Sequence, residues 1–244
     1  MMNWSPCVPA SRLPGVSPDS LNTGLDGLNA MAAARGLVSG GGKPLRFVAP
    51  PDDGAIYELR IRDSGEVATR PGSTHDLLNA RAWLDFPHTK AALNRLHCAE
   101  LEKQHGTQRS PLRDALTLFD ESGLIVACDR PELVSLLRGF KWKPLFWQHR
   151  AEVRQAMRFE VLGHALAEKL HAPYKGITAH ALVLALSAAV PREKLDQYAA
   201  AALALLANTR DLAPLPVLGI PGWTPDSENP VYYDDTTQFR GGRR

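Results

Sequence analysis

Along the first half of the chain, the spacing of apolar residues switches between the 3.6-residue period of helices and the two-residue period of strands. Apolar positions at helical spacing predict a helix within residues 17–36, a second over 74–85 and a third over 88–105. Between the first two helices, the β-prone stretch 56–67 turns at residues 63–65 and predicts a β-hairpin. Glycine or proline marks the end of each helix, because neither residue continues a helix well.

The second half of the chain is predicted to be mostly helical. Residues 116–126 suggest a second hairpin, and residues 158–163 read as a strand that leads into a helix over 163–171. Apolar runs over 179–189 and 191–207 predict two more helices. Because strands and helices do not alternate regularly, we expect an α+β fold, mostly helical with short antiparallel β-hairpins, in a single compact domain.

Proline and glycine set the expected domain boundaries. Residues 1–54 contain seven prolines and eight glycines, and the run Gly40–Gly42 is typical of a flexible joint. We therefore expect a Pro/Gly-rich N-terminal segment over 1–44 with one helix, a single domain over 45–223 and a C-terminal tail over 224–244.

Composition and charge exclude several classes of protein. The 244 residues are 44% hydrophobic and carry 28 Lys+Arg against 26 Asp+Glu, a formal net charge of +2. These values exclude disorder over most of the chain, a fibrous protein and a polybasic arm that binds nucleic acid by charge alone. The longest apolar stretches, 181–190 and 198–207, fall short of the roughly 18 residues that a membrane-spanning helix needs.

The termini and the cysteines bear on the compartment. The N-terminus shows no basic segment followed by an apolar run, so we predict no secretory signal. Cys7, Cys98 and Cys128 are scattered and none stands in CxxC spacing, which favours free thiols in a reducing compartment over a zinc site built from thiolates. We expect a cytoplasmic protein without a membrane partner.

The first candidate site lies on the helix predicted over 163–171. His164 and Glu168 are four residues apart and therefore share one helix face. Such a pair can bind a divalent metal, or the carboxylate can orient the imidazole for acid–base chemistry. The spacing is not the HExxH of zinc proteases, and an ordinary exposed polar face remains the alternative.

Further candidates are scattered between residues 75 and 180. His75 and Asn79 share one face at a predicted helix start, and Arg113 and Thr117 would share one face of a strand. Asp120 falls in a predicted turn, where aspartate is also common for structural reasons. His180 stands at the head of an apolar segment, where a lone histidine is more often structural than functional.

A basic and aromatic pattern suggests a different class of ligand. Lys141-Trp142-Lys143 places a stacking residue between two cations, and the chain ends in Arg240-Gly241-Gly242-Arg243-Arg244. Both features occur in proteins that bind single-stranded RNA. The chain as a whole is nearly charge-balanced, however, so we expect nucleic acid not to be its ligand.

Several blocks of the sequence together resemble a known family. These blocks are residues 75–94, from His75-Asp76-Leu77-Leu78-Asn79 to Asn94, residues 113–123, from Arg113-Asp114 to Gly123, Gly163-His164-Ala165-Leu166-Ala167-Glu168-Lys169, and Leu218-Gly219-Ile220-Pro221-Gly222-Trp223. The combination is similar to bacterial proteins grouped as domain of unknown function 3025, over roughly residues 45–240. The resemblance implies a bacterial origin and one continuous domain, and it implies no activity.

These observations leave three hypotheses about function open. The leading one is a hydrolase or related transferase that acts on a small polar or anionic substrate, with a divalent metal ion as a possible cofactor. Its expected catalytic residues are His164, Glu168, His75 and Asp120, its expected metal ligands are His164, Glu168 and His180, and its expected substrate-binding residues are Arg113, Lys90, Asn79 and Thr117. The alternatives are a single-stranded RNA-binding protein and a protein-interaction module with structural His and Asp residues, in which the three histidines would lie more than about 10 Å apart.

Overall fold

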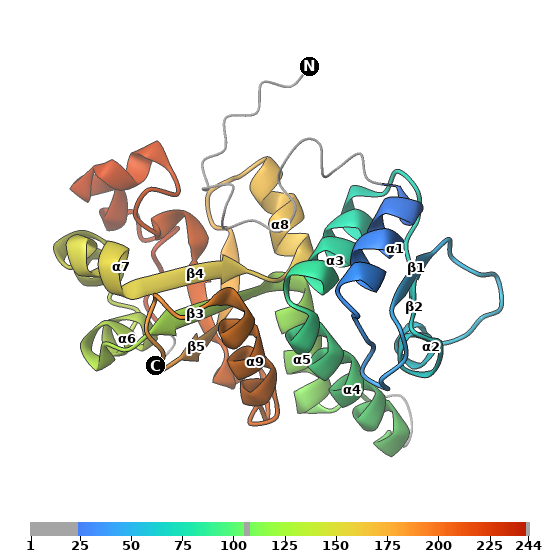
Figure 1. The fold of residues 1–244 in the computed structure, drawn as a ribbon. Helices are drawn as coiled ribbons and strands as arrows, with labels where there is room; N and C mark the ends of the chain where they lie inside the picture. Colours follow the sequence, from blue (N-terminus) through green and yellow to red (C-terminus); the bar gives the residue numbers. More distant parts are fainter. Residues whose placement is uncertain (1–23, 105–107, 243–244) are drawn as a thin grey trace.

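A four-stranded sheet forms the centre of the fold in the computed structural model, which describes residues 24–104 and 108–242 (Figure 1). The strand order is β4 (Met157–Val161), β3 (Gly123–Cys128), β5 (Thr178–Leu184), β6 (Ala213–Pro216). The central pair β3 and β5 runs parallel, whereas β4 and β6 are antiparallel to their neighbours. Helices make up most of the remaining described structure, so the prediction of an α+β, mostly helical fold is confirmed.

Helices bury both faces of this sheet. All of β3 is buried, and its alternate residues serve two different cores. Ile125 and Ala127 pack on one side against α4 (Pro87–Lys103), α5 (Pro111–Ser122) and α9 (Arg192–Leu203). The opposite face packs against α6 (Pro131–Arg138), the π-helix η3 (Pro144–Gln148), α7 (Arg150–Ala156), α8 (His164–His171) and the segment after β6.

A smaller unit precedes the central sheet in the chain. Its two-stranded parallel sheet, β1 (Arg46–Val48) and β2 (Glu66–Ala68), packs with α1 (Leu25–Ala34), α2 (Tyr57–Ser64) and α3 (Thr74–Asp85) (Figure 1). A third core around Phe47 and Trp83 holds these elements together. Helix α3 also packs against α8, which brings this unit beside one end of the central sheet.

Neither of the two expected hairpins forms. The stretch 56–67 contains helix α2, and β2 pairs in parallel with β1. Gly65 lies at φ 76° as the left-handed cap of α2, so the glycine that suggested a hairpin turn ends a helix instead. The stretch 116–122 belongs to α5, where Ser110 accepts a hydrogen bond from the Arg113 backbone N–H and Pro111 occupies the first turn.

Two other local predictions are wrong for tertiary reasons. Residues 178–184 form the buried strand β5 and not a helix, because a short apolar run flanked by two strands gains most by pairing with them. Gly40 is a close contact and not a flexible joint, since a Cβ atom there would lie 2.6 Å from the Arg95 backbone nitrogen.

The remaining element predictions agree with the structure where it describes them. α3, α4, β4, α8 and α9 lie within or close to their predicted ranges, and α1 forms the second part of the helix predicted within 17–36. The predicted start of that helix falls outside the described residues. Leu28 and Ala32 of α1 pack in the same core as Phe47, across the boundary expected at residue 44. No helix in the described part of the chain has the length and hydrophobicity needed to cross a membrane.

Candidate functional site

A pocket of about 490 Å³ lies where the smaller unit meets the end of the central sheet. Its walls come from α2, α3, α4, α5 and α8, and its polar lining includes Tyr57, His75, Asn79, Glu121 and His164. The helices that contribute are far apart in the chain, and their packing places these side chains around one cavity.

Two histidines and one glutamate converge in this pocket. The rings of His75, at the start of α3, and His164, at the start of α8, lie edge to face with centroids 4.5 Å apart. Nε2 of His164 lies 3.5 Å from Oε2 of Glu121, at the end of α5. One potential ligand atom from each residue lies within 4.8 Å of the other two, which is close enough for all three residues to share one metal ion.

Glu168 takes a different place from the one expected. It lies one helical turn after His164, but its Oε2 is 3.0 Å from Nδ1 of His75. A carboxylate at this distance favours the tautomer in which Nδ1 carries the proton and donates to Glu168. The Nε2 atom of His75 is then the one left with a free lone pair.

Local sequence explains how the two helix starts are held. A Cβ atom at position 163 would lie 2.4 Å from the Gly123 backbone nitrogen, so only glycine lets the turn between β4 and α8 pass this close to the start of β3. The Ser73 side chain caps α3 by accepting a hydrogen bond from the backbone N–H of Asp76. The carboxylate of Asp76 pairs with Arg70 at 2.7 Å. Both histidines are therefore attached to fixed backbone.

A buried polar chain runs behind the metal-binding candidates. Lys90, only 3% exposed, pairs with Asp120 and donates to Oδ1 of Asn79 at 2.9 Å. The Nδ2 group of Asn79 in turn donates to the Tyr57 hydroxyl at 2.8 Å. A buried ammonium is stable only with such partners, because removing it from water without them costs several kcal/mol.

Burial sets the protonation of the site. It lowers the pKa of His164 to about 4, so this imidazole is neutral near pH 7. Burial, reinforced by the nearby Asp120 charge, raises the pKa of Glu121. Burial also acts to raise the pKa of Asp120, but the Lys90 ammonium outweighs it with help from His164, and the net shift is downward. The pocket thus offers a neutral imidazole beside carboxyl groups, a donor set suited to a divalent cation.

The family match covers most of the chain. A family model described as protein of unknown function (DUF3025) matches residues 45–243. The chain belongs to this DUF3025 family. No curated protein matches it, and no solved structure does. Membership agrees with the resemblance found in the sequence, and the description of the family names no activity.

The other residues that the sequence suggested for the site of this DUF3025 protein lie in the pocket, beneath it or outside it. Thr117 lines the pocket, whereas Arg113 donates to Oε1 of Gln104 at 2.5 Å and lies outside the lining. Lys90 and Asp120 meet beneath the pocket, and Asp120 also lines it. The structure therefore brings His75, Asn79, Thr117, Asp120 and His164 to one cavity.

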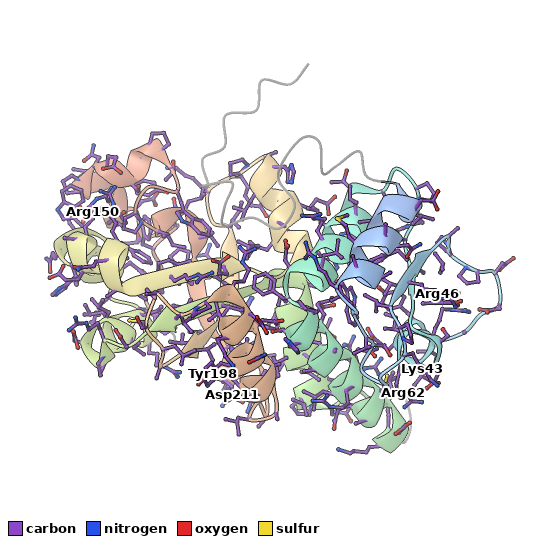
Figure 2. All side chains as sticks on the ribbon, in the orientation of Figure 1. Lys43, Arg46, Arg62, Arg150, Tyr198 and Asp211 are labelled. Atoms are coloured by element: carbon purple, nitrogen blue, oxygen red, sulfur yellow. The ribbon has the colours of Figure 1, made fainter. Side chains whose placement is uncertain are left out.

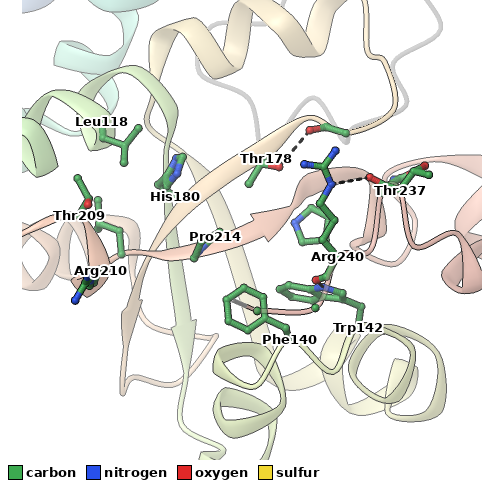
Figure 3. Close-up of a pocket in the computed structure, with 16 residues that line it drawn as sticks. Leu118, Phe140, Trp142, Thr178, His180, Thr209, Arg210, Pro214, Thr237 and Arg240 are labelled. Carbon is green, nitrogen blue, oxygen red and sulfur yellow. Dashed lines mark hydrogen bonds between the residues drawn. The ribbon is translucent and has the colours of Figure 1, made fainter. Parts of the chain in front are cut away.

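His180 lies on β5 in the wall of a second cavity of about 690 Å³ (Figure 3). Its neighbours there include Leu118, Thr178 and Pro214. The cluster of potential metal ligands in the described residues does not include it.

Trp142 lies in the wall of that second cavity, but its ring is not available for stacking on bases. It is 4% exposed, it stacks on Phe146 at 5.9 Å between centroids, and its Nε1 donates to the Arg240 carbonyl at 2.7 Å. Lys143 forms an ion pair with Asp234 at 2.7 Å. These contacts give Trp142 and Lys143 a structural role. Arg243 and Arg244 lie outside the described residues.

The sequence pattern missed three residues that surround the site, Tyr57, Glu58 and His97, and it marked a fourth, Asn94, only as a polar residue of the family-like blocks. Tyr57 and Glu58 lie on α2 and line the pocket, but the sequence predicted a hairpin for this segment and so gave no reason to group them with the site. His97 and Asn94 lie on the inner face of α4 beneath it. Their helical spacing from Lys90, at i+7 and i+4, was the signal that could have grouped them.

Proposed function

We propose that this protein is a divalent-metal-dependent hydrolase that acts on a small polar substrate, with His75, His164 and Glu121 as its metal ligands. The observation that carries the proposal is the convergence of these three side chains, whose ligand atoms lie within 4.8 Å of one another in a 490 Å³ pocket. Two imidazoles and a carboxylate form a ligand set that leaves further coordination positions open in hydrolytic zinc enzymes.

The surroundings of the ligands support a metal site. Glu168 on Nδ1 of His75 matches the arrangement in which an outer carboxylate orients a ligating imidazole and makes it more basic. His164 is neutral near pH 7, which leaves it free to bind a cation. In this proposal Glu168 orients His75 and does not bind the metal. Glu121 is the carboxylate ligand, a role that the sequence had suggested for Glu168.

A metal ion bound here would polarise a substrate oxygen and activate a water molecule. The chain's own residues would hold the ion, keep His75 in one tautomer and confine the substrate. Among the described lining residues, the Arg70 guanidinium is engaged by Asp76, and beneath the pocket Lys90 is engaged by Asp120. With no unpaired cation in this lining, an uncharged polar substrate fits better than an anionic one.

Metal titration tests the proposal. Purified protein stripped with chelator is titrated with Zn²⁺ by calorimetry and with Co²⁺ by visible absorption. We expect one site per chain, with affinity lowered at least 10-fold in His75→Ala, His164→Ala and Glu121→Gln. The matched control is His149→Ala, which removes an exposed histidine that lies 3.5 Å from Glu152 on α7. Absence of binding at micromolar metal, or equal affinity in all variants, would overturn the proposal.

A further inference from the structure

We propose that Tyr57 donates a hydrogen bond to an acceptor oxygen of the substrate, of the carbonyl type found in amides and esters, and that Lys90 and Asn79 set the direction of that bond. This inference rests on the metal site proposed above and names the group of the substrate that the pocket recognises. It follows from the order of donors and acceptors along one hydrogen-bond chain, which leads from the buried Lys90 through Asn79 to Tyr57.

The chain begins at Lys90, whose ammonium can only donate hydrogen bonds. Its Nζ contacts Asp120 and lies 2.9 Å from the side-chain amide of Asn79. Because a lysine cannot accept, the atom of Asn79 that faces it must be the carbonyl oxygen Oδ1. The donor-only chemistry of the lysine therefore determines the orientation of the Asn79 amide.

The orientation of Asn79 then determines the role of Tyr57. With Oδ1 turned to Lys90, the Nδ2 group points at the Tyr57 hydroxyl, 2.8 Å away. An amide NH₂ can only donate, so the phenol oxygen accepts and the phenol proton must point elsewhere. Within the described residues Tyr57 has no second hydrogen-bond partner.

The phenol proton is available inside the pocket. Tyr57 lines the same cavity as His75, Glu121 and His164, and it is 37% exposed as a residue. Asn79, which holds the hydroxyl, lies one helical turn after His75 on α3. A tyrosine hydroxyl has an ordinary pKa of roughly 10, so it keeps its proton at neutral pH.

A preset donor beside a metal site selects for an acceptor. A neutral phenol aimed into the pocket gains from a substrate that presents a carbonyl oxygen, and gains more as negative charge builds on that oxygen during hydrolysis. The carboxylates near the site disfavour a strongly anionic group in this position. Lys90 and Asn79 act through Tyr57 and are positioning residues.

The experiment uses full-length protein loaded with Co²⁺ and two small metal-binding probes. Acetohydroxamic acid presents a carbonyl oxygen to Tyr57, whereas ethanethiol binds a metal through sulfur and is a weak acceptor. Tyr57→Phe is compared with Tyr198→Phe, a control that changes an exposed tyrosine on α9 (Figure 2). We expect Tyr57→Phe to weaken acetohydroxamate binding about 10-fold or more while ethanethiol binding stays unchanged.

A second variant tests the positioning chain without removing the hydroxyl. Asn79→Asp replaces the amide donor by an acceptor, so the Tyr57 hydroxyl should turn its proton toward residue 79. The ratio of acetohydroxamate to ethanethiol affinity should then fall, as it does in Tyr57→Phe.

The outcomes separate this inference from the metal proposal. If Co²⁺ binds in every variant and the affinity ratio is the same in Tyr57→Phe and the wild type, the role of Tyr57 is refuted and the metal site stands. If Co²⁺ gives no absorption bands in the wild-type protein, the metal site is refuted and the inference falls with it.

Discussion

The imidazole rings of His75 and His164 lie 4.5 Å apart between centroids, at an interplanar angle of 75°. They meet because α3 and α8 pack together and each ring belongs to the first turn of its helix. For these two histidines the separation is far below the roughly 10 Å or more that the interaction-module hypothesis expects, whereas the third, His180, lies in another cavity.

Glu168→Gln should weaken metal binding without abolishing it. A glutamine amide oxygen can still accept from Nδ1 of His75, but it lacks the negative charge of the carboxylate that now lies 3.0 Å from that atom. Changing such an outer partner typically lowers metal affinity by about 10- to 100-fold. Zn²⁺ titration measures the effect. Glu152→Gln is the matched control, because Glu152 lies 3.5 Å from the exposed His149 on a helix away from the pocket. A Glu168→Gln variant with wild-type affinity would contradict an orienting role.

Lys90→Met should destabilise the protein by about 3–5 kcal/mol, because it leaves the Asp120 carboxylate without its cation in a largely buried place. The double variant Lys90→Met/Asp120→Leu should recover part of that loss, since it removes both charges together. Urea unfolding followed by circular dichroism gives the free energies. Equal losses in the single and double variants would show that the lysine stabilises by packing alone.

Gly163→Ala should lower the free energy of unfolding by about 1–3 kcal/mol, the usual range for overpacking. The new Cβ atom would lie 2.4 Å from the Gly123 backbone nitrogen and 2.6 Å from the Glu121 carbonyl oxygen, so the β4–α8 turn must move. Because that movement displaces His164 relative to Glu121, Zn²⁺ affinity should fall as well. Gly24→Ala is the control, since nothing lies within 4 Å of a Cβ at that position.

Stability should decrease as the pH falls from about 6.5 toward 4. Burial lowers the pKa values of His164 and His97 to about 4, well below the roughly 6.5 of an exposed histidine. In this range the unfolded chain takes up protons that the folded chain does not, and each histidine contributes up to about 1.4 kcal/mol per pH unit. The half-buried carboxyls with raised pKa values, such as Glu58 and Glu121, oppose part of this trend.

His164→Gln should therefore make the unfolding free energy less dependent on pH than in the wild type between pH 6.5 and 4. Urea unfolding at several pH values in this range measures the slopes, with His149→Gln as the exposed control. An unchanged slope in His164→Gln would show that this imidazole takes up its proton over the same pH range in the folded and the unfolded protein.

The sequence predicted those elements whose signals are local. The helical period over 74–85 and the break at Phe86-Pro87 gave α3 and the start of α4, and Gly163 ahead of His164 located the start of α8. The same patterns identified His75 and His164 as the polar residues at two helix starts. Capping and periodicity act within a few residues, so a single sequence carries them.

Elements whose identity depends on distant partners were predicted wrongly. The run 178–184 becomes a strand because β3 and β6 lie beside it, and Gly65 caps a helix where it had suggested a hairpin. Because the sequence predicted a hairpin where α2 forms, it did not identify Tyr57 as a residue of the site. The hydrophobic periodicity of a segment does not specify which distant segment will pack against it.

The chain by itself thus determined the fold class, most helices and the types of side chain available for chemistry. Tertiary structure alone decided that Glu121 joins His75 and His164, that Glu168 turns to His75, and that His180 lies in another cavity. The reason is physical: a site needs atoms within a few ångströms, and those distances arise when α3, α5 and α8 bury their apolar faces together. Sequence spacing constrains only neighbours on one helix or strand.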